Sequence, residues 1–234
     1  MRDMKFAGGV KAVFFVILTL ALCCGFANAQ SNSYANMLNT TMVASQSLFT
    51  AQTAVNKQRE SMAQAAGVTD YSYERQPAKQ YPITATDIRP LSPPIIPGQF
   101  ADSATGVDAA TRETMRQFFQ QTLTSFESQA RKNNLANAFT WISEAALKVK
   151  NGKQLSDPEE ARLIAYFNNT LAASPSYYTI NPRQQQMLYE SLIITGGIIV
   201  FLDDQGKQTN NRELQKQAKE MSSAVLKNFL GINN

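Results

Sequence analysis

The chain has 234 residues, with 22 lysines and arginines against 18 aspartates and glutamates, no histidine and two cysteines. The absence of histidine removes the commonest general base, and it excludes serine triads, cysteine proteases that use histidine, and zinc or haem sites built on imidazole. The basic residues form no cluster of the kind that neutralises phosphates, so no nucleic-acid partner is expected.

Residues 1–29 have the organisation of a cleavable signal peptide. Basic residues come first, an apolar run occupies residues 12–26, and Ala-Asn-Ala precedes the expected cleavage site after Ala29. An uncleaved membrane anchor is the alternative, although about 15 apolar residues are few for a bilayer that needs about 20. We therefore expect a periplasmic or secreted protein that begins at Gln30 and has no membrane span after cleavage.

Cleavage at this position would also change the chemistry of the chain. It removes Cys23 and Cys24, so the mature protein would have no thiol and no disulfide. The leader carries three of the basic and one of the acidic residues, which leaves a net charge near +2. We expect no cofactor, no metal site and stability from burial alone.

Two segments of different character follow the leader. Residues 30–67 form an arm rich in Gln, Ser and Thr, whose thin apolar spacing permits a helix but predicts little burial. Residues 68–107 contain six prolines, and we expect a linker or a surface wrap there. A polyproline ligand for a partner is a weaker alternative, because the prolines are irregularly spaced.

Residues 108–234 are expected to form a helical domain of about five amphipathic helices. In residues 110–133 the apolar side chains recur every three or four positions, and Asp108 is the expected N-cap. The second helix begins after an N-cap at Asn133 or Asn134. It ends at Gly152, because glycine readily adopts the left-handed conformation of a C-cap.

Trp141, the single tryptophan, lies on the edge of the apolar stripe of this second helix. We expect its ring to be buried at the edge of the core while its N–H reaches a carbonyl or water. A ligand platform is the alternative. Glu144, three residues further on, is expected on a neighbouring, solvated face.

The third and fourth helices have recognisable ends. The third has Asp157 as its expected N-cap and ends before Pro175. The fourth begins at Asn181 and runs to Leu202. Its apolar second half is too short for a second membrane span, so a central core helix is expected.

Gly196 and Gly197 lie within the fourth helix, where each costs about 1 kcal/mol relative to alanine. They would be explained by another helix that crosses closely at this point. The fifth helix, residues 211–231, has one apolar and one charged face. No long segment alternates as a strand would, so the predicted fold class is all-α, a compact helical bundle.

Carboxylates are the remaining candidates for chemistry. The acidic run at residues 157–160 is explained by helix capping and the helix dipole. Asp203 and Asp204 precede Gly206, but their spacing does not match a calcium loop, and we expect a solvated turn between helices there. The sequence therefore predicts no catalytic, cofactor-binding or metal-binding residue.

Three stretches together resemble a known family: YPITATDIRP (81–90), NNLANAFTWISEAALKVKNG (133–152) and the segment 155–202. They are similar to the exported bacterial proteins called domain of unknown function 6683, in which a tyrosine-proline segment precedes an asparagine-alanine-aromatic helix. Trp141 stands alone where that family has a second aromatic residue. The resemblance covers about residues 81–231 and implies an exported helical protein, without an activity.

We expect an exported, non-catalytic binding or accessory module with a protein partner in the cell envelope. A helical component or chaperone of a secretion or pilus apparatus is the alternative, and a buried, rigid arm at residues 31–67 would favour it. A carboxylate-only enzyme acting on cell-wall glycans is the third hypothesis, and two convergent carboxylates in one deep cleft would favour it. The sequence leaves the oligomeric state open.

Overall fold

The structure is a computed structural model, and it describes residues 79–104 and 108–232. The expected signal peptide, its cleavage site and the arm at residues 30–67 lie outside the described residues. The described residues comprise the proline-rich segment from residue 79 to residue 104 and most of the helical domain.

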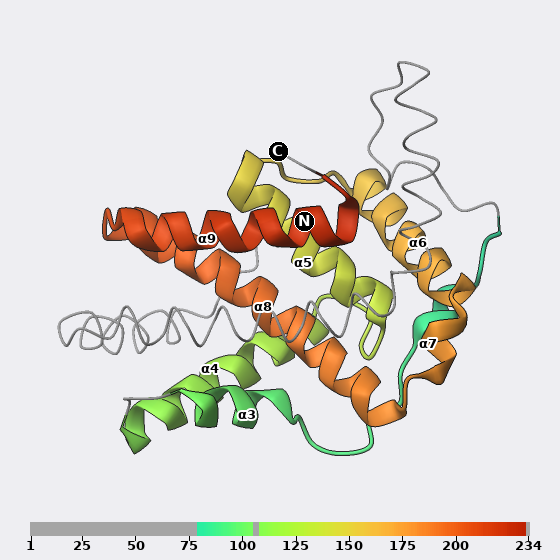
Figure 1. Cartoon of the computed structure of the whole chain (residues 1–234), viewed down its shortest axis with the longest axis horizontal. Helices are drawn as coiled ribbons and strands as arrows, with labels where there is room; N and C mark the ends of the chain where they lie inside the picture. The colour runs from blue at the N-terminus through green and yellow to red at the C-terminus, as the bar shows by residue number, and fades with distance from the viewer. Residues whose placement is uncertain (1–78, 105–107, 233–234) are drawn as a thin grey trace.

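Seven α-helices make up the described part, which contains no β-strand and one isolated bridge between Asp87 and Asn134 (Figure 1). A 3-10 turn, η2 (Ile83–Thr86), precedes them and a π-helical turn, η3 (Leu226–Leu230), ends the fold. The all-α fold class is confirmed, and α3 and α7 are additional to the five predicted helices. The helices are α3 (Ile96–Ser103), α4 (Ala109–Glu127), α5 (Leu135–Asn151), α6 (Asp157–Ala173), α7 (Pro175–Thr179), α8 (Pro182–Gln208) and α9 (Arg212–Val225).

α5 and α8 are the central pair of helices. α5 packs against α8, α9 and α6, and Figure 1 shows α8 crossing the molecule between α9 on one side and α3 and α4 on the other. α8 is long and apolar enough to cross a membrane, but 78% of its most apolar 18-residue window is buried inside the protein. It is therefore the core helix of the described domain, as its sequence indicates.

The predicted N-cap of α4 and both predicted caps of α5 are confirmed, and α4 ends at Glu127, before the end of the predicted stretch at residue 133. The Asp108 carboxylate accepts a hydrogen bond from the backbone N–H of Thr111 at 2.7 Å, and Asn134 Oδ1 accepts one from the N–H of Asn137 at 3.0 Å. Gly152 closes α5 with a φ of 67°, which is the left-handed conformation expected of a C-cap.

The predicted N-cap of α6 was wrong by one residue, because Ser156 and not Asp157 holds that position. The backbone N–H and the hydroxyl of Ser156 both donate to the Glu159 carboxylate at 2.8 Å. This arrangement is a capping box, in which a residue three positions after the N-cap satisfies its N–H. It also lowers the pKa of Glu159 to about 2, first through the hydrogen bonds from Ser156 and then through Lys153.

The solvated turn predicted at Asp203 is instead helical, since α8 continues to Gln208. Asp203 is buried and accepts a hydrogen bond from Lys207 one turn later, which supports the helix. Gly206 allows α9 to approach closely, because a Cβ there would lie 2.9 Å from the backbone nitrogen of Gln215. The turn itself follows at residues 209–211.

The close helix crossing predicted at Gly196 and Gly197 is confirmed. A Cβ on Gly196 would lie 2.5 Å from Nε1 of Trp141 on α5. A Cβ on Gly197 would lie 2.5 Å from Cγ2 of Thr122 on α4. The absence of both side chains therefore lets α8 contact two helices at one level.

The proline-rich segment wraps over the domain where the structure describes it. Ile88 and Ile96 are buried in the core, and α3 packs along α4. The buried Glu190 carboxylate on α8 accepts hydrogen bonds from the backbone N–H groups of Ile95 and Ile96, both at 2.8 Å. The sequence left a linker and a surface wrap as alternatives for this segment. Residues 79–104 pack on the domain as a surface wrap does.

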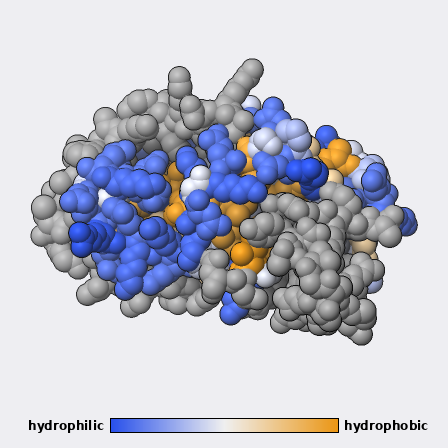
Figure 2. Space-filling model, turned by 90° about the horizontal axis from the view of Figure 1, so that it is seen from above, coloured by the Kyte–Doolittle hydropathy of each residue, from blue (hydrophilic) through white to orange (hydrophobic). Residues whose placement is uncertain are grey.

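The surface of the described part is mainly hydrophilic on the face seen in Figure 2, with apolar residues visible between the polar ones. The large apolar side chains that are exposed among the described residues are Ile83, Leu91 and Tyr178. A few exposed apolar residues of this kind are normal for a folded protein.

Candidate functional site

Trp141 is buried in the core, as expected of a core-edge residue and not of an exposed ligand platform. Its side chain is 9% exposed, and its Nε1 donates a hydrogen bond to the backbone carbonyl of Ile193 on α8 at 3.0 Å. Its ring lies 6.1 Å from the ring of Phe126, centroid to centroid. The prediction of a core-edge tryptophan is confirmed. The part of the Trp141 side chain that the core leaves uncovered lines a pocket.

This pocket, which we call the acidic pocket, has a volume of about 410 Å³ and lies between the end of α4, the middle of α5 and the start of α6. Helix α5 supplies polar and aromatic side chains, and the first turn of α6 supplies carboxylates. The residues from these two helices are Asn137, Thr140, Trp141, Glu144, Asp157 and Glu160.

Glu144 contradicts the expectation of a solvated face. Its side chain is only 9% exposed, because the start of α6 lies against this part of α5, and its Oε1 has no hydrogen-bond partner among the described residues. Burial raises the pKa of Glu144 to about 8, and the nearby carboxylate of Glu160 adds to the shift. At neutral pH the Glu144 carboxyl therefore holds its proton.

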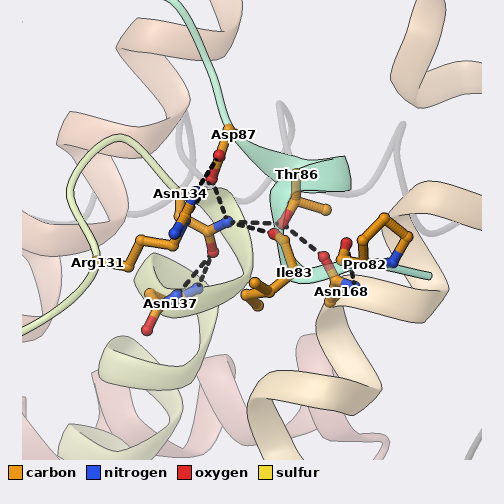
Figure 3. A network of polar contacts seen from close by, with 8 residues as sticks. All are labelled: Pro82, Ile83, Thr86, Asp87, Arg131, Asn134, Asn137 and Asn168. Carbon is orange, nitrogen blue, oxygen red and sulfur yellow. Dashed lines mark hydrogen bonds and ion pairs between the residues drawn. The ribbon is translucent and has the colours of Figure 1, made fainter. Parts of the chain in front are cut away.

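A second group of polar residues lies beside the acidic pocket and is centred on Asn134 (Figure 3). Asn134 is fully buried, and its Nδ2 lies 2.9 Å from the carbonyl oxygen of Ile83, 3.1 Å from Oγ1 of Thr86 and 2.8 Å from Oδ1 of Asp87. Arg131 donates two hydrogen bonds to the Asp87 carboxylate, at 2.8 and 2.5 Å. The hydrogen bond from Arg131 is the main reason that the pKa of Asp87 is lowered.

The same network reaches α6 through Asn168. Thr86 donates its hydroxyl hydrogen to Oδ1 of Asn168 at 2.9 Å, and Nδ2 of Asn168 donates to the carbonyl oxygens of Tyr81 and Pro82 at 3.0 and 3.2 Å (Figure 3). Each of these polar side chains has a hydrogen-bond partner within the protein, so the network holds residues 81–87 against α5 and α6.

Asn137 connects the two groups. Its Nδ2 donates to Oδ1 of Asn134 at 2.8 Å, while its side chain also lines the acidic pocket. The network therefore fixes the start of α5, and with it one wall of the pocket. Among the described residues, no group of three or more aspartate, glutamate, histidine or cysteine side chains is placed to hold a metal ion.

The family model described as a family of unknown function (DUF6683) matches residues 6–234. The chain belongs to this family. No curated protein and no solved structure matches the chain. In this DUF6683 protein, the two shorter stretches that carry the resemblance contact each other, because residues 81–87 are bound to the helix that begins with NNLANAFTW.

Sequence reasoning named no site residue in this DUF6683 protein, and it missed the acidic pocket. Glu144 and Glu160 belong to different helices, and only the packing of α6 on α5 places both on one cavity. The one available signal was the position of Glu144 beside the apolar stripe of α5, three residues from Trp141. That signal does not distinguish a buried carboxyl from a solvated one.

Proposed function

We propose that this protein is an exported, non-catalytic binding module of the cell envelope, and that the acidic pocket is its binding site. The signal-peptide pattern of residues 1–29 supports export, and the absence of histidine from the chain supports a role without catalysis. The volume of about 410 Å³ is in the range of pockets that hold small ligands.

The observation that carries this proposal is the unpartnered Oε1 of Glu144. A buried polar atom without a hydrogen bond costs about 1–3 kcal/mol, and folded proteins contain few of them. Oε1 belongs to a side chain that lines a cavity, so a ligand that donates a hydrogen bond there would remove this cost. Ligand binding is thus a physical reason for keeping a carboxyl at this position.

The test is a thermal-shift titration of the exported protein with low-mass fractions of an envelope extract. A ligand present at about 100 times its Kd stabilises the folded state by about 2.7 kcal/mol, which is a rise in Tm of several degrees. The rise should disappear in Glu144→Gln and persist in Asp204→Asn, which alters an exposed carboxylate on α8 outside the pocket. The proposal is wrong if no fraction shifts the Tm, or if Glu144→Gln responds as the wild type does.

A second function, hydrolysis of cell-wall glycans, is favoured by one observation. Glu144 and Glu160 line the same cavity, and the raised pKa of Glu144 keeps it protonated at neutral pH. Glycosidases use such a pair, with one carboxyl as the acid and the other ionised.

This second function has its own test. The exported protein is incubated with purified cell-wall glycan, and new reducing ends are measured. Hydrolysis predicts their release by the wild type and loss of release in both Glu144→Gln and Glu160→Gln. A wild type that releases none excludes the enzyme and leaves the binding module.

A further inference from the structure

The hydrogen-bond donors on the wall of the acidic pocket are largely used within the protein. The indole N–H of Trp141 donates to a backbone carbonyl of α8 at 3.0 Å. Thr140 and Ser128 donate their hydroxyl hydrogens to backbone carbonyls of the preceding turn, at 2.9 and 2.8 Å. Asn137 and Gln129 each donate one of their two amide hydrogens, at 2.8 and 3.1 Å. Apart from the O–H of the protonated Glu144 carboxyl, the wall therefore has few donors left to offer a ligand.

The wall also carries an unpartnered acceptor and negative charge. The unpartnered Oε1 of Glu144 belongs to the pocket lining, and Glu160 and Asp157 bring two carboxylates from α6. No lysine or arginine is among the described residues that line the cavity. A ligand that complements this wall must donate hydrogen bonds and carry positive charge.

The aromatic side chains define the rest of the ligand. Trp141 and Phe126 both line the pocket, with their rings tilted by 50° relative to each other. Aromatic rings attract cations through their faces and provide apolar contact for hydrocarbon groups. A ligand with a small apolar group beside its positive charge would make both kinds of contact with these rings.

We infer that the ligand of the acidic pocket is an organic cation, whose ammonium or guanidinium group donates to Glu144 and whose apolar body contacts Trp141. This inference rests on the proposed binding function, and it names the class of ligand. A neutral sugar is a poorer match, since each hydroxyl must accept as well as donate and the wall has few donors left. An anion would meet the carboxylates of Glu160 and Asp157 and the carboxyl of Glu144, and the described lining residues include no lysine or arginine.

The test compares three probes with the same body and different head groups: benzylamine, benzyl alcohol and benzoate. Trp141 is the single tryptophan, so its emission reports on the pocket directly. We expect benzylamine to give a saturable change in Trp141 emission. The alcohol and the benzoate should bind about tenfold more weakly or not at all, because each lacks a charge-assisted hydrogen bond to Glu144.

Matched variants test whether benzylamine binds at the acidic pocket. At a pH near the Glu144 pKa of about 8, where the carboxyl ionises, Glu144→Gln keeps the shape of the side chain and should weaken benzylamine binding by about tenfold, as should Glu160→Gln. Asp204→Asn should bind as the wild type does. Far-UV circular dichroism of each variant confirms that it is folded before its affinity is compared.

The pH dependence gives an independent readout. Among the described residues, the charged groups that line the pocket with Glu144 are the carboxylates of Glu160 and Asp157 on α6, and the end of α4 contributes none. A bound cation favours the ionised form of Glu144, so benzylamine binding should tighten as the pH approaches the Glu144 pKa of about 8. This dependence should be lost in Glu144→Gln.

The outcomes separate the ligand class from the binding function. If benzyl alcohol or benzoate binds as tightly as benzylamine, the cation inference is overturned while ligand binding at the pocket stands. If none of the three probes changes Trp141 emission and no envelope fraction shifts the Tm, both proposals are overturned. Equal benzylamine affinity in the wild type and in Glu144→Gln also refutes the inference, because it removes Glu144 as the recognised group.

Discussion

Replacing Gly196 with alanine should destabilise the protein, although alanine is the better helix former. The added Cβ would lie 2.5 Å from Nε1, 2.9 Å from Cδ1 and 3.1 Å from Cε2 of Trp141. The indole is a rigid ring packed between α5 and α8, and it cannot yield as the end of a flexible side chain can. Relief of the contact requires that the ring or one of the helices moves.

The magnitude follows from three contributions. Overpacking of a filled core costs about 1–3 kcal/mol. Movement of the ring also loses the hydrogen bond from Trp141 to Ile193, which is about 1 kcal/mol. The helix propensity of alanine returns about 1 kcal/mol. The net loss is about 2 kcal/mol, or about 6 °C in Tm for a domain of this size.

The assay is equilibrium unfolding in urea, followed by the emission of Trp141 and by far-UV circular dichroism. Gly98→Ala is the matched control, because it lies in α3 with nothing within 4 Å of an added Cβ. It should be neutral or stabilise by up to about 1 kcal/mol. If Gly196→Ala is as stable as the wild type, with native Trp141 emission unchanged, the close packing of α8 on α5 is refuted.

Three other changes test the remaining geometry. Trp141→Ala should cost about 3 kcal/mol, and native Trp141 should emit in the blue and resist acrylamide; ready quenching would contradict its burial. Burial raises the pKa of Glu144 from 4.5 to about 8, so the folded state keeps a proton that the unfolded state releases. The free energy of unfolding should therefore fall by up to about 1.4 kcal/mol per pH unit as the pH rises between these values, and it should change less with pH in Glu144→Gln. Urea unfolding at several pH values measures it, and the same pH dependence in both proteins would exclude the shift. Glu190→Ala should cost about 3 kcal/mol and speed hydrogen exchange at the amides of Ile95 and Ile96, whereas unchanged exchange would show that Glu190 does not hold α3.

Local patterns were sufficient for the elements whose signals lie within a few residues. Asp108, Asn134 and Gly152 act as caps because each interacts with atoms of its own helix end, and such contacts depend on spacing alone. The same method placed the N-cap of α6 one residue late, because Ser156 and Asp157 both fit a capping position. Only the hydrogen bonds to Glu159 distinguish them.

The proline-rich segment shows where local patterns stop. Prolines indicated an interrupted chain, and residues 79–104 do lack long helices, but their place on the domain depends on distant partners. Asn134, Asn168 and Glu190 hold this segment from 47 or more positions away in the sequence. No periodicity records a contact of that range, so α3 was not predicted and the sequence left a linker and a surface wrap as alternatives.

The sequence by itself determined the all-α class, the apolar faces of the five longer helices and the close approach at Gly196, since each follows from helical periodicity or from the absence of a side chain. The tertiary structure decided the environment of the carboxylates. Glu144 is predicted to be solvated if α5 is considered alone, and it is buried because α6 begins against the same face. Burial in a medium of low polarity changes the protonation of a carboxyl, and it depends on which helices pack together. The acidic pocket and the Glu144 pKa of about 8 are therefore properties of the packing of α6 on α5.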